Sequence, residues 1–283
     1  MESRMAKRRP LALVIGSGSV KCAAALGVWK ALRREGIELD MIVGCSGGSM
    51  YAAVIALGWE LETAIEKTQS MWTEDLVAGY AGNLKAVMSG EADFNERSGI
   101  VDGGPLLAVL SSAYGDKTFA DTRIPLHIVA TDLKTGEKVV MSTGKILDAV
   151  RASIAIPLVF PPWEVNGRLL VDGAVSNPLP VDVAIKEGGQ IILSLGFDLP
   201  YRPRLRSFNA VQAQLNAIYI NTILRSTYSF YNLAHHAELI SLWPDFDKQI
   251  ANFDTRQFPY IIERGERAME EHLPYLRRLL NSP

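Results

Sequence analysis

Several features that mark other protein classes are missing from this sequence. Its 283 residues include only two cysteines, too few for a disulfide framework, which favours a reducing compartment. No uninterrupted apolar run approaches about 18 residues, so no transmembrane helix is expected. The 29 basic and 31 acidic residues leave a net charge of −2, which disfavours a nucleic-acid-binding protein, and the 48% apolar content disfavours a disordered one. The composition is that of an ordinary globular protein.

The amino terminus resembles a secretory signal only in its first residues. A basic stretch over residues 4–9 precedes an apolar run, but that run extends only over residues 11–15 before Gly16. A signal peptide carries an apolar region of about 7–15 residues. We therefore predict a first β-strand at this point and a cytoplasmic protein.

Apolar runs and helical patterns alternate from the beginning of the chain. LALVI, the alanine-rich CAAALGVWKALRREGI, DMIVG and SMYAAVIALG are typical of strand, helix, strand and helix in turn. This alternation predicts an α/β fold with a parallel sheet. Further strands are expected at 126–130, 139–141, 169–171 and 191–195, and helices near 146–152 and 181–187.

Two segments depart from this alternation. Residues from about 59 to 120 are predicted to form helices joined by glycine-rich turns, an insertion of the kind that often forms a lid. They interrupt a core that we place at residues 10–200. Residues 201–283 differ in composition, and we expect a mainly helical carboxyl-terminal extension packed on that core.

In this extension a long helical stretch over residues 207–239 carries one apolar stripe. The stripe consists of Phe208, Val211, Leu215 and Ile218. We predict that it faces the core, as in an ordinary amphipathic helix, and contact with lipid is the alternative. Three arginines before the helix either face anionic headgroups at a membrane surface or belong to a solvated loop. They are Arg202, Arg204 and Arg206.

The segment GCSGG at residues 44–48 fits the pattern G-x-S-x-G and lies between an apolar strand and a helical run. A serine on a tight strand-to-helix turn projects its hydroxyl away from the sheet, and small neighbours avoid clashes in the turn. The following helix directs its N–H groups and positive dipole end toward a developing oxyanion. We predict that Ser46 is a nucleophile; the alternative is a glycine-rich turn that only packs closely.

A second glycine-rich turn, GSGSVK at residues 16–21, follows the first strand and opens the first helix. Its backbone N–H groups predict an anion site, either for a dinucleotide pyrophosphate or for the oxyanion of acyl transfer. Lys21 replaces the third glycine of the dinucleotide pattern and no acidic residue ends the second strand, so a nucleotide-binding module is the weaker alternative. Neighbouring parallel strands end at one edge of a sheet, so both turns should face one site.

A serine nucleophile needs a base, and the sequence offers two kinds. His127 lies within an apolar strand, whereas His235 and His236 fall late enough for the order Ser, Asp, His of an α/β hydrolase. The alternative is a carboxylate at Asp172, in an Asp-Gly pair that follows an apolar strand; burial would have to raise its pKa. Asp102 has the same local sequence, but Pro105 after it favours a role in capping a helix.

These residues together resemble the patatin-like phospholipases. LALVIGSGSVKCAAALGVWKALRREGI resembles the oxyanion segment and first helix of that family, and GCSGGS resembles its nucleophile turn. The stretch from ATDLKTGEKVVMSTG through AVRASIAIPLVFPPWEVNGRLLVDGAVSNPLPVDVA resembles its approach to the catalytic Asp-Gly pair. The likeness covers about residues 10–195 and is greatest to bacterial members and to the neuropathy target esterase catalytic domain.

The resemblance implies a three-layer α/β/α fold and a catalytic dyad of Ser46 and Asp172 without a catalytic histidine. It further implies no metal and no cofactor. The family's turn of three glycines falls on Ser17, Gly18 and Ser19, with Lys21 at its basic position.

These correspondences select the backbone donors for an oxyanion. Gly18, Ser19 and Gly47 are the expected members of the oxyanion hole, and Gly16 joins them if the alignment shifts by one residue. Lys21 either contacts an anionic group of the substrate or caps a neighbouring carbonyl.

The resemblance predicts a serine acyl hydrolase of lipid esters, of the lipase, phospholipase or lysophospholipase type, which works through an acyl-enzyme. Transfer of the same acyl group to an alcohol or thiol would make it an acyltransferase. The expected partner is a lipid or other acyl ester, with peripheral contact to a membrane and no nucleic acid.

Overall fold

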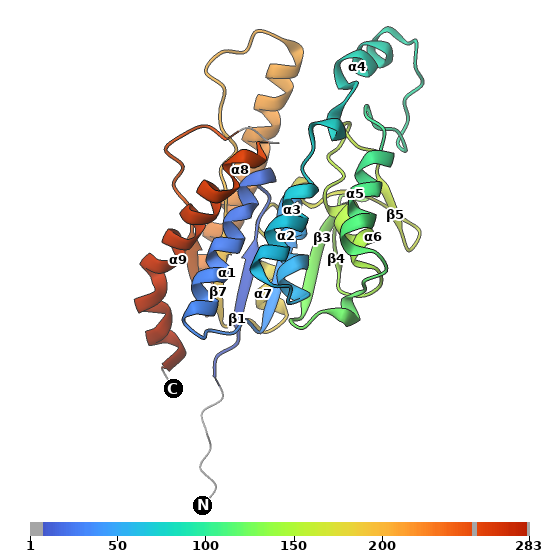
Figure 1. Cartoon of the computed structure of the whole chain (residues 1–283). Helices are drawn as coiled ribbons and strands as arrows, with labels where there is room; N and C mark the ends of the chain where they lie inside the picture. Colours follow the sequence, from blue (N-terminus) through green and yellow to red (C-terminus); the bar gives the residue numbers. More distant parts are fainter. Residues whose placement is uncertain (1–7, 251–253, 282–283) are drawn as a thin grey trace, which may run out of the picture.

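The computed structural model describes residues 8–250 and 254–281 (Figure 1). The strands are β1 (Leu11–Ile15), β2 (Met41–Cys45), β3 (Leu126–Asp132), β4 (Lys138–Met141), β5 (Trp163–Val165), β6 (Arg168–Asp172), β7 (Ile191–Leu195) and β8 (Glu238–Leu242). The α-helices are α1 (Ala24–Arg34), α2 (Gly47–Ala56), α3 (Leu61–Ser70), α4 (Tyr80–Ser89), α5 (Gly104–Tyr114), α6 (Ile146–Ser153), α7 (Val181–Lys186), α8 (Phe208–Ala234) and α9 (Phe258–Asn281). The predicted first strand is β1; residues 4–7 of the basic stretch before it lie outside the described residues.

The strands form one mainly parallel sheet, which confirms the predicted fold class. The order of hydrogen-bonded strands is β5-β6-β3-β2-β1-β7-β8, and β4 also pairs with β3. β3, β2, β1, β7 and β8 are parallel to one another, whereas β4 and β6 are antiparallel to β3 and β5 is antiparallel to β6. The antiparallel direction of β6 differs from the simple parallel arrangement that the alternating pattern predicts.

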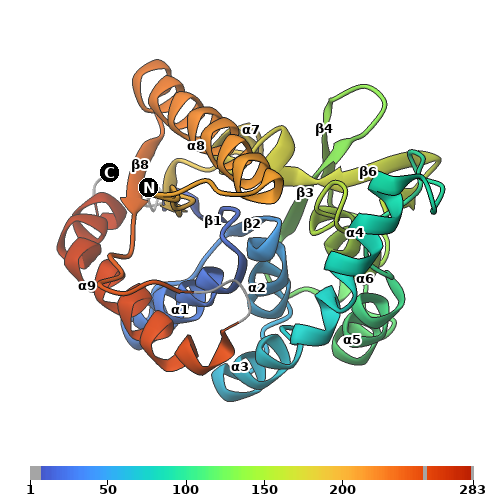
Figure 2. The ribbon, with the colours of Figure 1, turned by 90° about the horizontal axis from the view of Figure 1, so that it is seen from above.

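Helices cover both faces of the sheet and give it three layers. β1, β2 and β7 are buried along their whole length, which is why they read as continuous apolar runs. Figure 2 shows α1, α2 and α9 on one side of the sheet and α7 and α8 on the other. The buried side chains accordingly form two apolar clusters, one on each face.

β2 and β6 meet end to end along β3. β4 pairs with residues 128–131 of β3 and occupies one edge of that strand, so β2 and β6 both use the other edge. β2 pairs along this edge as far as Val129, where its partner is Cys45. From Ala130 onward this edge of β3 pairs with β6, and the partner of Ala130 is Asp172. Since β6 runs antiparallel to β3, the carboxyl ends of β2 and β6 point toward each other.

The predicted insertion at 59–120 contains α3, α4 and α5, and α4 rises above the sheet (Figure 1). The segment that follows α4 is tied to a loop of the core. The N–H of Ile100 donates to the carbonyl of Leu158, and that of Val101 donates to the carbonyl of Val159. These bonds connect the insertion to residues that come shortly before β6.

The carboxyl-terminal region completes both the sheet and one helical layer. β8 pairs in parallel with β7 at the edge of the sheet. α9 crosses α1 with direct backbone contact, because a Cβ added at Gly27 would lie 1.9 Å from the carbonyl oxygen of Ile262, and one at Gly265 would lie 2.0 Å from that of Ala24. Sequence analysis predicts a mainly helical extension in this region but not the strand β8 or the bounds of α9, although the buried residues of α9 recur at helical spacing.

The apolar stripe of α8 faces away from the core, so the prediction that it packs inward is wrong. Phe208, Val211, Leu215 and Ile218 are all exposed. The other face of the helix packs on the core. Its buried members are Ala210, Ala217, Asn221 and Leu224, and its partly buried members in contact with the apolar cluster are Ile220, Tyr228 and Tyr231. Asn221 explains part of this orientation, because its side chain bonds both the N–H and the carbonyl of Leu199 at 2.9 Å.

Candidate active site

Ser46 lies on a sharp turn between β2 and α2. Its φ of 53° and ψ of −132° place a non-glycine residue in a strained backbone region. The neighbouring glycines permit this turn: a Cβ at Gly44 would lie 2.6 Å from the Cβ of Ala52, and one at Gly48 would lie 2.4 Å from the carbonyl oxygen of Ile15. The G-x-S-x-G pattern is therefore explained by close backbone packing around the serine.

Asp172 is the direct hydrogen-bond partner of Ser46. The Ser46 hydroxyl donates to Oδ2 of Asp172 at 2.7 Å, and the N–H of Ala174 donates to Oδ1 at 2.8 Å. The carboxyl group belongs to a residue that is only 4% exposed. Desolvation by burial raises the pKa of Asp172 from 3.8 to about 6, although the bonds from Ser46 and Ala174 act in the opposite direction. Such a group is ionised near neutral pH and is more basic than an ordinary carboxylate.

The meeting of β2 and β6 accounts for this contact. Gly173, directly after Asp172, is packed so closely that a Cβ there would lie 2.3 Å from the carbonyl oxygen of Val129 and 2.9 Å from the sulfur of Cys45. The hydroxyl of Thr131 donates to the carbonyl of Asp172 at 3.0 Å. Glycine after the aspartate and a small residue before the serine therefore allow the two strand ends to approach. Cys45 is buried in this contact.

Ser153, at the end of α6, supports the nucleophile turn and was missed by sequence reasoning. The N–H of Ser46 donates to the Ser153 hydroxyl at 2.8 Å, and that hydroxyl donates to the carbonyl of Val129 at 2.6 Å. Ser153 is fully buried. It thus joins the first residue of the turn to β3. The only signal in the sequence is a serine at the end of a predicted helix, within RASIAIP.

We expect Ser153→Ala to slow the reaction of Ser46 about 10-fold or more, because it leaves the Ser46 amide and the Val129 carbonyl without their buried partner. An unsatisfied buried group costs about 1–3 kcal/mol. The measurement is the rate of fluorophosphonate labelling at a temperature where the variant is folded. Ser194→Ala is the matched control, since Ser194 is also fully buried but bonds Ile240 in β8. Equal rates in the two variants would contradict a positioning role for Ser153.

The first glycine-rich turn lies against the nucleophile turn. A Cβ at Gly47 would lie 2.9–3.0 Å from backbone atoms of Ser19, and Ser19 itself has a φ of 54°. Gly18 is required by packing as well, because a Cβ there would lie 2.4 Å from the Phe197 ring. The two turns that the sequence predicts at one edge of the sheet are therefore in contact.

Not every amide of this turn is available for an oxyanion. The N–H of Gly16 donates to the carbonyl of Leu195 at 2.9 Å, and that of Ser17 donates to the carbonyl of Pro178 at 2.8 Å. The shifted alignment that includes Gly16 is thus disfavoured, because its amide is already used. The same bonds remove two of the donors that a phosphate-binding turn would need.

The ammonium group of Lys21 donates a hydrogen bond to the carbonyl of Asp198 at 3.3 Å. Burial lowers the pKa of Lys21, while the charge of Asp198 acts in the opposite direction. Of the two predicted roles, the structure shows the cap on a neighbouring carbonyl. Cys22, at the position of the family's last glycine, is buried and donates from its thiol to the carbonyl of Gly16.

The alternative bases are not hydrogen-bonded to the serine in the part of the chain that the structure describes. In the described part of the chain, no hydrogen bond joins a histidine to Ser46. His127 lies on β3, while His235 and His236 follow α8, and the side chain of His235 accepts from the N–H of Ala237. Asp102 accepts from the N–H of Gly104, the first residue of α5, but Gly103 rather than Asp102 is the N-cap of that helix, so the predicted capping role is not what the structure shows.

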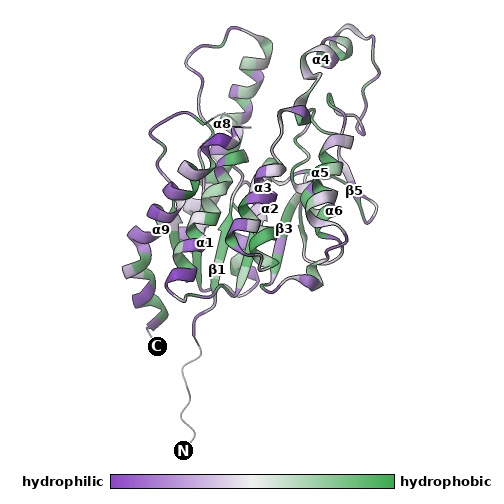
Figure 3. Ribbon diagram, viewed as in Figure 1, coloured by the Kyte–Doolittle hydropathy of each residue, from purple (hydrophilic) through white to green (hydrophobic). Residues whose placement is uncertain are grey.

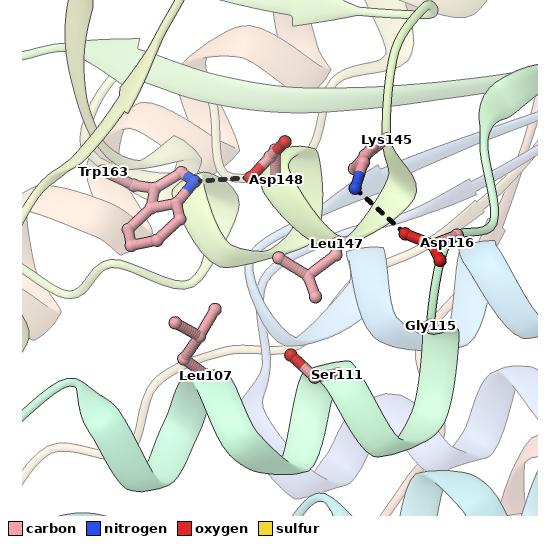
Figure 4. A pocket seen from close by; sticks show the side chains of 8 residues that line it. All are labelled: Leu107, Ser111, Gly115, Asp116, Lys145, Leu147, Asp148 and Trp163. Carbon is pink, nitrogen blue, oxygen red and sulfur yellow. Dashed lines mark hydrogen bonds and ion pairs between the residues drawn. The ribbon is translucent and has the colours of Figure 1, made fainter.

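Two surface cavities lie apart from the dyad. The first, of about 430 Å³, is between α5 and α6, and Figure 4 shows two bonded pairs among its polar side chains. Trp163 donates to Asp148, and Lys145 is paired with Asp116. The second, of about 410 Å³, lies beside α8 and includes Asn177. Within residues 8–250 and 254–281, no cluster of three or more His, Cys, Asp or Glu is arranged to hold a metal ion.

Comparisons with known proteins agree on one family. Residues 13–185 match the family model described as patatin-like phospholipase. An uncharacterized NTE family protein of Mycobacterium bovis is 28% identical over 230 residues, which cover 81% of this chain and 60% of that protein. Patatin-like phospholipase domain-containing protein 7 of Mus musculus is 27% identical over 196 residues, which cover 68% of this chain and 14% of that protein.

A solved structure shares the fold. The human GIVD cytosolic phospholipase A2, in complex with methyl gamma-linolenyl fluorophosphonate, matches with a TM-score of 0.50 and 12% identity over 96% of this chain and 59% of that one. The chain spans less than two thirds of the length of these relatives. The family model nevertheless covers more than half of the 283 residues. On that match, and with the sheet and turns described above, the chain belongs to the patatin-like phospholipase family.

Proposed function

We propose that this protein hydrolyses the acyl esters of lipids through a Ser46–Asp172 dyad. Membership of a phospholipase family supports hydrolysis of lipid esters as the general activity. The observation that carries the specific proposal is the 2.7 Å bond from the Ser46 hydroxyl to a buried carboxylate whose pKa is about 6. This pairing supplies a nucleophile and a base within direct reach of each other.

In the proposed reaction Asp172 takes the proton of the Ser46 hydroxyl as the oxygen attacks the ester carbonyl carbon. The tetrahedral intermediate then collapses, and protonated Asp172 gives its proton to the departing alcohol. Water attacks the acyl-enzyme in the second half, with Asp172 again accepting and returning the proton. Ser46 is thereby regenerated and a fatty acid is released.

The oxyanion of both intermediates needs donors that are fixed before the reaction. We assign this role to the N–H groups of Gly18 and Gly47, with Ser19 supporting the close contact between the turns. Gly47 is the first residue of α2, so its amide has no partner within the helix. The positive end of the helix dipole adds to the stabilisation of the oxyanion. Phospholipids and lysophospholipids are the substrates we would examine first.

Labelling with a fluorophosphonate tests this proposal directly. We expect the intact protein to gain one adduct and peptide mapping to place it on Ser46, because the probe reports an activated serine. The unfolded protein is the control, since it retains every serine but loses the dyad. Fatty-acid release from a panel of phospholipids and lysophospholipids then defines the substrate. Labelling of another serine, or equal labelling after unfolding, would contradict the proposal.

A further inference from the structure

The two faces of α8 are unusual in their distribution of apolar residues. Its buried face combines alanine, asparagine and leucine with partly buried isoleucine and tyrosine side chains, yet further large apolar side chains point to solvent. We call the four exposed residues on one side the α8 stripe: Phe208, Val211, Leu215 and Ile218, with exposed fractions of 63%, 42%, 43% and 39%. Their spacing places them within one side of the helix. Contiguous exposed apolar surface of this kind marks a site of interaction with a partner or a membrane.

The charge around the stripe is of one sign. Asp198 precedes this segment and Glu238 follows it, and no Asp or Glu occurs between them. Arg202, Arg204 and Arg206 lie in the exposed loop that leads into α8. Among the described residues, none of these three side chains is in an ion pair. The chain as a whole has a net charge of −2, so the loop and stripe differ strongly from the average surface.

The position of the stripe relates it to the proposed active site. Figures 1 and 2 show that the amino-terminal half of α8 rises above the edge of the sheet at which β1 and β2 end. Ser46 follows β2 directly at that edge. In Figure 3 the hydrophilic loop leads into the more hydrophobic first turns of α8.

Exposed apolar side chains also occur in the two segments that hold Asp172. Val175 is exposed in the turn that follows Asp172. Ile156 and Leu158 are exposed in the loop whose Ala155 carbonyl accepts from the N–H of Asp172. Exposed apolar side chains therefore lie in the segments next to the proposed dyad. They belong to the same edge of the sheet above which α8 rises.

We propose that the α8 stripe and its three arginines dock this protein on an anionic lipid bilayer. The guanidinium groups would pair with phosphate or carboxylate headgroups, and the apolar side chains would enter the boundary between headgroups and acyl chains. Exposed apolar side chains next to a basic segment are suited to this position in the interface. The bilayer is favoured over a second copy of the chain because the loop carries only positive charge. Docking would bring lipid to Ser46, and in that respect the inference rests on the proposed function.

Vesicle binding by the full chain tests the docking surface separately from catalysis. The probes are phosphatidylcholine vesicles with and without about 30% phosphatidylglycerol, sedimented in 0.1 M and 0.5 M salt. We expect stronger binding to the anionic vesicles, and a loss of that preference at high salt. Each arginine near an anionic surface contributes about fivefold, so neutralising Arg202, Arg204 and Arg206 to glutamine should weaken binding roughly 100-fold.

A second variant, Phe208→Gln with Leu215→Gln, tests the apolar part of the surface. We expect at least about 10-fold weaker binding, because two large side chains no longer enter the lipid. The matched control is Phe230→Gln with Leu233→Gln, which changes two apolar residues of the same helix that are 62% and 85% exposed but lie toward its carboxyl end. This control should bind as the wild type does. All these positions are exposed, and a thermal melt checks that folding is unchanged.

Hydrolysis of a short-chain, water-soluble ester separates the two proposals. All the docking variants should hydrolyse it at the wild-type rate, while their hydrolysis of vesicle lipid falls with binding. Binding without any ester hydrolysis would overturn the proposed function and leave the docking surface standing. Equal binding to neutral and anionic vesicles, or unchanged binding in both variants, would overturn the docking surface. A stripe variant that only turns a dimer into a monomer would assign the stripe to a second copy of the chain instead.

Discussion

Replacing Ser46 with alanine is expected to reduce ester hydrolysis by roughly 10⁴-fold or more, since no nucleophile remains to form the acyl-enzyme. The fold should persist, because the turn is held by the contacts of Gly44 and Gly48 and by the bond from the Ser46 amide to Ser153. The measurement is kcat for a soluble ester, together with loss of fluorophosphonate labelling. Ser111→Ala, which removes a hydroxyl from α5 at the cavity in Figure 4, is the control and should be fully active.

The alanine variant also isolates the effect of the Ser46 hydroxyl on its partner. Its bond to Oδ2 lowers the pKa of Asp172, so its removal should raise that pKa further above 6. Substantial hydrolysis by Ser46→Ala would mean that another group performs the attack. In that case the dyad would have to be abandoned as the source of activity.

Asp172→Asn is expected to lower kcat by about 10²–10⁴-fold, because the amide cannot accept the proton of Ser46. The substitution is nearly isosteric: the amide oxygen can still accept from Ala174, and the amide nitrogen can donate to the Ser46 hydroxyl. Asp102→Asn is the matched control, since Asp102 also precedes a glycine and accepts from the backbone N–H two residues ahead, but it lies in the turn before α5. Comparable losses in the two variants would refute a special role for Asp172.

The same carboxyl group sets an expected pH dependence. Asp172 acts as a base only when ionised, so wild-type kcat/KM should rise with pH and level off above a midpoint near 6. The residual activity of Asp172→Asn should lack this transition. A flat wild-type profile between pH 5 and 8 would show that a group other than Asp172 limits the reaction.

Stability should change with pH in the opposite direction. The pKa of Asp172 is raised from 3.8 to about 6 by folding, so the native state holds a proton that the unfolded state has released between those values. The free energy of unfolding therefore falls as pH rises through this window, by about 3 kcal/mol in all, and is constant above it. Asp172→Asn should remove that loss and be more stable than wild type at pH 8. Denaturant unfolding of both proteins from pH 4 to 8 measures the difference.

Ser46 and Asp172 could be proposed from local sequence, because each lies beside glycines at positions where the backbone packs too closely for a larger residue. Their meeting could not be predicted from that pattern. That contact requires β6 to run antiparallel to β3 and to pair with the same edge of β3 just beyond the last residue that pairs with β2. Both pairings join segments that are distant in the sequence. Ser153 was missed for the same reason: its partners lie in distant segments, Ser46 in the turn after β2 and Val129 in β3.

The orientation of α8 shows a second limit of sequence patterns. Helical spacing identifies an apolar stripe, but it does not say whether the rest of the protein covers that stripe. Here the opposite face, with Leu224 among its buried residues, packs on the apolar cluster, and Asn221 is satisfied by the backbone of Leu199. The alternating strands and helices of the core were predictable because their apolar runs are buried on both faces.

The crossing of α1 and α9 limits how the part of the chain that carries the candidate site can be transferred into another protein. The match to the family model ends at residue 185, so a chimera could be designed with residues 13–185 alone. Yet Gly27 and Gly265 touch the opposing backbone, so a foreign helix with any larger residue at the crossing would be forced away from α1. The first glycine-rich turn, for which we propose an oxyanion donor, leads into α1 through residues 19–23. A chimera that ignores the last helix would therefore disturb the geometry of the donors beside Ser46, even though no atom of α9 belongs to them.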